Sequence, residues 1–319
     1  MQRFTAFGVL LIALLPLLVA CGEQSPATVV ATATTPARTA TAVPEPTPTA
    51  VVTVSDFPLT ITDSNSQPVV FEKAPKRIAV FDSAVLEILF AIGEGGRIIA
   101  THDFATYPPE AADIVRVGDA FNVNIEKIVL LQPDLVFVFF PTALESLTNA
   151  GLKVLYLESL NDDFTRVADN IRLWGRIVGN PDAAEREAKK FEQRVDAIRA
   201  KLASQGEGPS VFQDVGGLWT PGPDTLVGEV FDLLKLRNIA HDVTGYAQLT
   251  PEQVVERNPE LIIAADPQAI VGTPAFKEVE AVKNGKVITL ENEPLSVAGP
   301  RFVDGIETVA KAAYPDLFP

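Results

Sequence analysis

Aromatic side chains stand in loops that follow predicted buried strands, where they could bind a bulky ligand. Phe104, Phe139 and Trp219 are the main examples, and Trp219 lies in a loop rich in glycine and proline. Their positions fit no helical or strand period that would assign them to a core. Each ring alone could pack against its own loop. As a set at one edge of a sheet, they predict an aromatic-lined cleft for a bulky, partly apolar ligand.

Residues that could perform catalysis or hold a free metal ion are scarce. The chain has no Gly-x-Ser-x-Gly or His-Glu-x-x-His motif, and its single cysteine, Cys21, stands near the N-terminus. His102 and His241 lie in different halves of the chain, so neither a base–nucleophile pair nor a zinc site is easy to assemble. We therefore expect no catalytic residue, no metal site, no cofactor and no enzymatic activity. An exported α/β enzyme such as a hydrolase, or a stalked adhesive or scaffolding module, remains an alternative.

One long helix is predicted at residues 180–205, between two similar segments. Asn180 suits the N-cap and Pro181 the first helical position, while Gly206 follows the end. Apolar residues spaced by four and three give the helix one narrow stripe, which predicts a rod lying across a surface. The stripe consists of Ala184, Ala188, Phe191, Val195, Ile198 and Leu202.

The segments on either side of this helix share a pattern. Residues 124–136 and 250–262 each read as a capping residue, an acid, an aliphatic pair, a proline, an acid and two aliphatic residues at the same offsets. Each predicts a short helix that stops before the proline and is followed by a buried strand. Two generic helix–strand units could resemble each other by chance, but the pattern favours two related lobes.

Strands and helices alternate along both halves, which is typical of parallel sheets covered by helices on both faces. We predict an α/β fold of two similar lobes, residues 57–179 and 206–319, joined by the rigid helix at 180–205. In such sheets, ligands bind beyond the carboxyl ends of the strands. The expected strands are 77–81, 97–100, 135–139 and 153–157, then 210–213, 261–264 and 286–290; the expected helices are 84–92, 125–131, 142–149 and 164–178, then 224–234, 251–257 and 301–314.

Composition and the N-terminal segment indicate an exported protein. The formal net charge of −15 over 319 residues argues against nucleic-acid binding. Residues 1–21 have the layout of a secretory signal ending in Leu-Val-Ala-Cys-Gly, which resembles a bacterial lipobox with Cys21 as the acylated residue. Residues 22–56, mostly Ala, Thr, Pro and Val, predict a flexible stalk. With one cysteine, the fold cannot contain an internal disulfide.

Short motifs in a fixed order resemble the substrate-binding proteins of ABC importers for ferric siderophores, haem and cobalamin, the class III periplasmic binding proteins. The resemblance extends from Pro75 to Phe318. The motifs lie at 76–80, 86–93, 107–111, 117–118, 124–126 and 133–136 in the first half, and at 225–229, 237–240, 252–253, 258–260, 284–287 and 299–301 in the second.

The resemblance implies a receptor that captures a metal chelate and delivers it to an ABC permease. In this family, one glutamate on each lobe docks onto permease arginines, and the matching positions are Glu126 and Glu252. Chemistry alone leaves another interpretation open, because an acid in a helix's first turn is stabilised by the helix dipole without a partner. Together with the lipobox, this resemblance predicts an exported protein, lipid-anchored to the outer face of the cell membrane or in the periplasm, and we expect a monomer.

The resemblance also implies which residues line the cleft. Aromatic residues of cobalamin-binding relatives match Phe104, Phe139, Trp219 and Tyr246, and Phe121 lies nearby in the sequence. Arg301 could pair with a ligand carboxylate or catecholate, or could cap its own helix. Thr106 stands where siderophore and cobalamin receptors often carry an aspartate. The resemblance therefore does not choose among the chelates.

Overall fold

The computed structural model describes residues 57–160, 163–290 and 294–319, which belong to one compact unit. Two sequence predictions lie outside these residues: the signal segment with Cys21 and the stalk at 22–56. None of the helices in the described ranges is long and apolar enough to cross a membrane.

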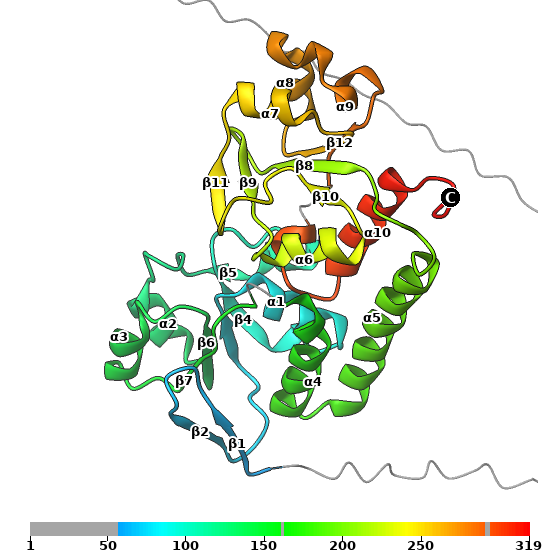
Figure 1. The fold of residues 1–319 in the computed structure, drawn as a ribbon. Helices are drawn as coiled ribbons and strands as arrows, with labels where there is room; N and C mark the ends of the chain where they lie inside the picture. Colours follow the sequence, from blue (N-terminus) through cyan, green and yellow to red (C-terminus); the bar gives the residue numbers. More distant parts are fainter. Residues whose placement is uncertain (1–56, 161–162, 291–293) are drawn as a thin grey trace, which may run out of the picture. The chain divides into compact units, whose positions relative to one another are not determined.

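A parallel five-stranded sheet with helices on both faces forms the first lobe (Figure 1). The strand order is β5-β4-β3-β6-β7, and a small antiparallel hairpin, β1–β2, precedes the sheet. The elements are β1 (Leu59–Thr62), β2 (Pro68–Phe71), β3 (Ile78–Val80), α1 (Ser83–Ala91), β4 (Ile98–Thr101), β5 (Val115–Arg116), α2 (Ile125–Leu131), β6 (Leu135–Val138), α3 (Leu144–Asn149), β7 (Val154–Tyr156) and α4 (Val167–Val178).

Alternate residues of the central strands face different helices. Ile78 and Val80 of β3 belong to the core that contains α1 and α4, whereas Ala79 belongs to the core that contains Ile128 of α2 and Leu147 of α3. This period of two, on strands that are apolar throughout, is the expected pattern for a parallel sheet covered on both faces.

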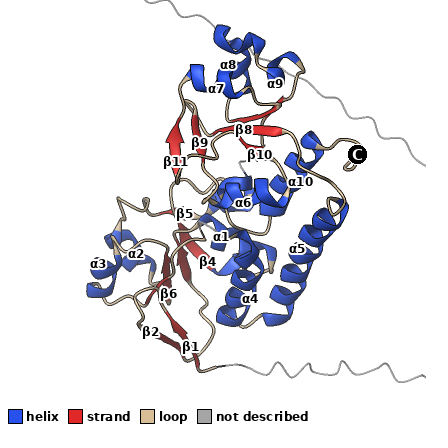
Figure 2. Cartoon of the chain, viewed as in Figure 1, coloured by secondary structure: helices blue, strands red, loops and turns tan. Residues whose placement is uncertain are grey.

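The second lobe repeats this architecture with a four-stranded parallel sheet of order β10-β8-β12-β13. Helices α6 and α10 lie on one side of it and α7, α8 and α9 on the other (Figure 2). The elements are β8 (Ser210–Asp214), β9 (Trp219–Pro221), α6 (Leu226–Leu233), β10 (Arg237–Asn238), β11 (Tyr246–Gln248), α7 (Pro251–Arg257), β12 (Leu261–Ala264), α8 (Pro267–Gly272), α9 (Glu280–Lys283), β13 (Val287–Ile288) and α10 (Phe302–Ala313).

The repeated segments fold into equivalent units, α2–β6 and α7–β12. The side chains of Asn124 and Thr250 each accept a hydrogen bond from the backbone of their helix's first turn. Both helices end in a left-handed residue, Gln132 with φ 50° and Asn258 with φ 41°. Asp134 and Glu260, the acids after the two prolines, accept backbone hydrogen bonds from the chain entering β3 and β8. The repeat predicted from the sequence therefore corresponds to two helix–strand units with the same caps, ends and hydrogen bonds.

Pro181–Lys201 forms the expected long helix, α5, and all six residues of its predicted apolar stripe are buried. The helix packs along α4, where Arg172 forms ion pairs with Glu185 and Glu192 at 2.7 Å. Its N-cap differs from the prediction. Asn180 occupies the N-cap position, but its side chain donates to the carbonyl of Ile92 and to Glu94 and makes no capping hydrogen bond.

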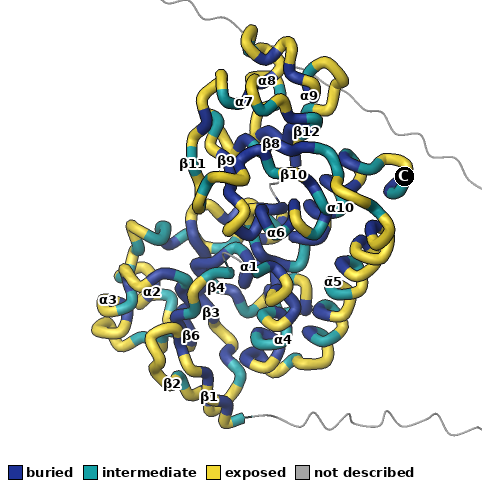
Figure 3. The backbone as a smooth tube through the Cα atoms, in the orientation of Figure 1, coloured by how far each residue is buried: buried dark blue, intermediate teal, exposed yellow. Residues whose placement is uncertain are grey.

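The two lobes share one continuous core, although the chain is long enough for two separate ones. A single buried cluster includes Val80 of the first sheet, Phe191 of α5 and Val211 of the second sheet. Phe164 also stacks on Phe302 of α10 at 5.8 Å between ring centroids. The buried backbone in Figure 3 accordingly runs from one lobe into the other. Because apolar packing continues across the junction, α5 is not the sole connection between the lobes.

Candidate ligand-binding site

Two adjoining cavities open where the strands of both sheets end. The larger has a volume of about 1240 Å³ and the smaller about 830 Å³. They share Ser83, Phe104, Ser296 and Val297, so together they form one space, called the cleft below. Its walls include the segments that follow β3, β6, β7, β8, β12 and β13. The cleft therefore lies at the carboxyl edge of both sheets, where the sequence predicted a ligand site.

The larger cavity is lined by phenylalanines that the sequence predicted. Phe104 and Phe121 are 71% and 85% exposed, and Phe139 is half-buried in the same cavity. Phe139 meets the buried Phe140 edge-to-face with ring centroids 5.0 Å apart, which fixes its orientation. Large aromatic rings left in contact with water next to a cavity are well suited to contact a ligand's apolar surface.

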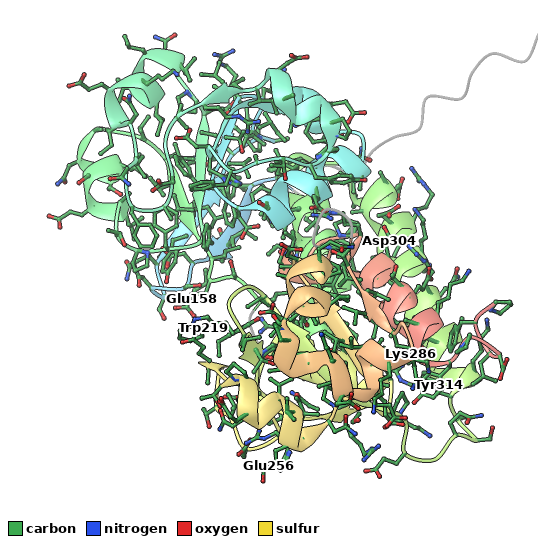
Figure 4. The ribbon with its side chains drawn as sticks, turned by 90° about the horizontal axis from the view of Figure 1, so that it is seen from above. Glu158, Trp219, Glu256, Lys286, Asp304 and Tyr314 are labelled. Carbon is green, nitrogen blue, oxygen red and sulfur yellow. The ribbon has the colours of Figure 1, made fainter. Side chains whose placement is uncertain are left out.

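Trp219 and Tyr246 lie together on a different element, the antiparallel hairpin β9–β11 of the second lobe. Gln248 pairs with Trp219 and Tyr246 pairs with Pro221, so both aromatic residues point to the same face of the hairpin. They are 46% and 51% exposed and line neither cavity. In Figure 4, Trp219 lies at the rim of the second lobe, away from Lys286 and Tyr314. Trp219 was expected in a loop, but backbone pairing with residues 246–248 makes it a strand residue.

A buried ion pair between the lobes lies in the wall of the smaller cavity. Arg301, at the N-cap of α10, donates from Nε to Oε1 of Glu87 on α1 at 2.7 Å, and its guanidinium lies 4.5 Å from the centroid of the Tyr107 ring. Burial raises the pKa of Glu87 to about 7, although the hydrogen bond and charge of Arg301 oppose this rise. Arg301 therefore lines the cleft, as predicted, with its guanidinium already bound to a carboxylate.

Glu87 itself was not predicted as a site residue. The sequence signal was present, because Glu87 is the one charged residue in the helix Ser83–Ala91 and is 4% exposed. A lone acid in an otherwise apolar helix needs a buried partner. The identity of that partner depends on the tertiary structure, because Arg301 lies 214 residues further along the chain.

Polar groups at the start of α1 form the boundary between the two cavities. Asp82 caps α1 by accepting from the Val85 amide at 2.9 Å and also accepts from Ser159 at 3.0 Å. Burial raises the pKa of Asp82. The hydroxyl of Ser83 lies 3.1 Å from Nε2 of His102. Burial, with a smaller contribution from the nearby Arg116 charge, lowers the pKa of His102 to about 4, so its imidazole is neutral at pH 7.

The two predicted docking acids lie in equivalent exposed positions. Glu126 is in the first turn of α2 and Glu252 in the first turn of α7, and neither forms an ion pair with another described residue. Backbone and Thr250 hydrogen bonds lower the pKa of Glu252. Both helices lie away from α5 in Figure 1.

Within the described ranges, no group of three or more His, Cys, Asp or Glu side chains is arranged to hold a metal ion. The arrangement suits capture of an intact molecule by aromatic contact and hydrogen bonding.

Comparison with known proteins agrees with this geometry. The model of a family described as periplasmic binding protein matches residues 78–294. An uncharacterized ABC transporter substrate-binding lipoprotein of Bacillus subtilis, YvrC, is 33% identical over 278 residues, covering 82% of this chain and 87% of the relative. The crystal structure of the periplasmic vitamin B12 binding protein BtuF of Vibrio cholerae superposes with a TM-score of 0.66 at 29% identity, covering 75% of this chain and 96% of that one.

A third similarity concerns the fold alone. The periplasmic heme-binding protein RhuT from Roseiflexus sp. RS-1 superposes with a TM-score of 0.67 at 22% identity, covering 76% of this chain and 99% of that one. The predicted two-lobed α/β fold is confirmed by these neighbours. The relatives are substrate-binding proteins rather than enzymes, as the scarcity of catalytic groups predicted.

Proposed function

The chain belongs to the periplasmic binding protein family and has the substrate-binding role of an ABC transporter, and from this premise we propose that it captures a metal chelate. The candidates are a corrinoid such as cobalamin, haem, or a ferric siderophore. Of the two relatives named above that carry a ligand in their names, one binds vitamin B12 and the other heme.

The observation that carries this proposal is the size and aromatic lining of the cleft. The larger cavity alone, at about 1240 Å³, exceeds the roughly 300–1,000 Å³ typical of sites for drug-sized ligands. Phe104, Phe121 and Phe139 supply ring surfaces that can contact a macrocycle or the apolar rim of a chelate. We assign these three residues to ligand contact.

Trp219, Tyr246 and Arg301 are proposed to complete the site from the second lobe. The two aromatic residues share one face of the β9–β11 hairpin and retain about half of their exposure, so they have surface left to contribute to a ligand. Arg301 is proposed to form, together with the Glu87 carboxylate that its Nε binds, a polar part of the cleft wall.

Docking to the permease is assigned to Glu126 and Glu252. Their equivalent positions in a repeated helix–strand unit support this role, because a transporter with two related subunits or halves would meet the same feature twice. Exposed aliphatic residues accompany both acids on the same helices: Leu130 on α2 is 82% exposed and Val255 on α7 is 38% exposed. An acid next to an apolar side chain is a reasonable contact surface for a protein partner.

The N-terminal segment is proposed to anchor the protein outside the cytoplasm. Residues 1–21 would direct export, acylated Cys21 would enter the outer surface of the cell membrane, and residues 22–56 would act as a tether. Labelling with radioactive palmitate should be lost in a Cys21→Ser variant if this assignment is correct.

Ligand capture is tested by titrating the purified protein with cyanocobalamin, haemin and a ferric hydroxamate, using calorimetry. We expect one of them to bind, and Phe104→Ala and Phe139→Ala to weaken that binding at least tenfold each. Val271→Ala, which removes an exposed apolar side chain from α8 outside the cleft, is the control and should bind normally. Absence of binding by all three chelates would refute the proposal.

Docking is tested separately in cells whose chelate uptake depends on this protein. The Glu126→Ala/Glu252→Ala double variant should bind the chelate normally but fail to support uptake. Glu256→Ala removes an exposed acid from the same helix, α7, and serves as the control that should retain uptake. Uptake by the double variant at the wild-type rate would exclude the docking assignment.

A further inference from the structure

The charged side chains that line the cleft are mostly acidic. Among the described lining residues, seven carry carboxylates and two carry guanidinium groups. The acids are Asp82, Glu87, Asp119, Glu158, Asp169, Asp214 and Asp224, and the bases are Arg166 and Arg301. Since His102 is neutral at pH 7, it does not offset this excess. This excess of negative charge affects ligand binding, because the electrostatic fields of like charges add up inside a cleft whose protein walls screen them poorly.

Local hydrogen bonds hold several of these carboxylates in fixed positions. Asp119 accepts from the amides of Phe121 and Asn122, which lowers its pKa. Asp214 accepts from two backbone amides of the turn that follows β8, and Asp224 accepts from the amide of Gly245. Even if burial leaves Asp82 and Glu87 protonated, the remaining acids outnumber the two arginines.

Arg301, the arginine that lines the smaller cavity, is poorly placed to compensate an anionic ligand. The guanidinium of Arg301 is bound to Glu87 at 2.7 Å and stacks on Tyr107. Arg166 is an exposed residue at the rim of the larger cavity. A ligand carboxylate entering the cleft would therefore compete with Glu87 for Arg301, at the cost of leaving Glu87 buried with less compensation.

As an independent observation, two residues that line the smaller cavity each have a buried side-chain oxygen without a hydrogen-bond partner. Glu87 is 4% exposed, lines the smaller cavity, and its Oε2 atom is buried with no hydrogen-bond partner. Oε1 of Gln213, in the wall of the same cavity, is also buried and unpartnered. Buried acceptors are normally paired, so the Gln213 oxygen, and Oε2 of Glu87 when the carboxylate is ionised, indicate that a ligand supplies N–H or O–H donors here.

From these features we propose that the cleft selects its chelate by charge: it admits uncharged or cationic chelates that donate hydrogen bonds, and it rejects polyanionic ones. This inference rests on the proposed function. Corrinoids whose side chains are amides, and ferric hydroxamates that carry an ammonium group, belong to the admitted class. Haem with its two propionates and ferric tris-catecholates belong to the rejected class.

The test compares chelates that share a framework and differ in charge. Aquocyanocobinamide carries amides where cobyrinic acid carries carboxylates, and ferrioxamine B carries an ammonium group that becomes a carboxylate in its N-succinyl derivative. Calorimetric titration should give at least tenfold tighter binding of the amide or ammonium member in whichever pair binds. Affinity for a cationic member should also fall as salt is raised from 10 to 300 mM, because ions screen the attraction.

A matched pair of variants identifies the cleft as the source of the discrimination. Glu158→Gln/Asp224→Asn removes two exposed charges from the cleft wall and retains acceptor oxygens, so the preference should shrink about fivefold or more. Glu256→Gln removes an exposed charge from the outer face of α7, where Figure 4 shows its side chain pointing outward, and should leave the preference unchanged.

The outcomes separate the two proposals. Tighter binding of the carboxylate members, or tight binding of haem, would overturn charge selection while leaving chelate capture intact. Failure of every chelate to bind, whatever its charge, would overturn chelate capture and charge selection with it.

Discussion

Replacing Glu87 by glutamine should stabilise the protein at neutral and alkaline pH but not at acid pH. The Glu87 side chain is buried in the smaller cavity and its Oε2 has no hydrogen-bond partner, so its ionised form is costly in the folded state. Glutamine is nearly isosteric and can still accept the hydrogen bond from Nε of Arg301. The substitution therefore removes the titrating charge with little change in packing.

The expected magnitude follows from the pKa of Glu87, which burial raises from an ordinary value of 4.5 to about 7. Below pH 4.5 the carboxyl is protonated in both the folded and the unfolded state. Between pH 4.5 and 7 only the unfolded state releases the proton, so the wild-type free energy of unfolding falls as pH rises. At about 1.4 kcal/mol per pKa unit, this loss approaches roughly 3 kcal/mol and is complete above pH 7.

The assay is urea unfolding of the wild type and of Glu87→Gln at pH values from 4 to 8.5. Subtracting the two free energies of unfolding cancels the other titrating groups. The variant should match the wild type near pH 4 and exceed it by roughly 3 kcal/mol at pH 8. Glu256→Gln, which removes an exposed carboxylate on α7, is the control for a charge change at the surface. A Glu87→Gln difference that does not change with pH would refute the account of a buried, destabilised carboxylate.

Two further predictions concern the core and the buried histidine. Gly175→Ala should lower the free energy of unfolding by roughly 1–3 kcal/mol, because the added Cβ would collide with Cβ of Ala184 where α4 meets α5. Gly272→Ala is the control, since a Cβ added there has no atom within 4 Å. Equal losses of stability in the two variants would contradict the packing argument. Burial lowers the pKa of His102 from 6.5 to about 4, so between these pH values only the unfolded state takes up a proton. The wild-type free energy of unfolding should therefore fall as pH drops from 6.5 towards 4. The His102→Gln variant should lack this part of the fall. Urea unfolding across this range measures it, and a parallel loss in the variant would exclude His102 as the cause.

Local sequence patterns predicted most of the large elements correctly. The helix α5 and its buried stripe followed from spacing of apolar residues, and the equivalent α2–β6 and α7–β12 units followed from capping residues and prolines at matching offsets. Short strands were missed. The two-residue strands β5 and β10 have no periodicity of their own and exist because a neighbouring strand supplies hydrogen-bond partners.

The candidate site was predicted only in part, because some of its residues are brought together by pairing between distant segments. Phe104 and Phe139 could be assigned to the cleft because topology requires loops after parallel strands to meet at one edge of the sheet, whereas Phe121 was suggested only by its place near residues that the family resemblance implied. The shared face of Trp219 and Tyr246 could not be derived, since it depends on antiparallel pairing between segments that are separated in the sequence. Their contribution to ligand binding, like the docking roles of Glu126 and Glu252, stays a prediction.

The amino-acid sequence by itself determined most of the longer helices and strands, because capping, proline and apolar spacing act over a few residues. Only the tertiary structure decided what the cleft presents to a ligand. The Glu87–Arg301 pair joins residues 214 positions apart, and the acidic excess arises from side chains contributed by separate loops of both lobes. Burial sets the pKa of Glu87 and long-range pairing sets its partner, and both depend on which surfaces meet when the lobes fold together.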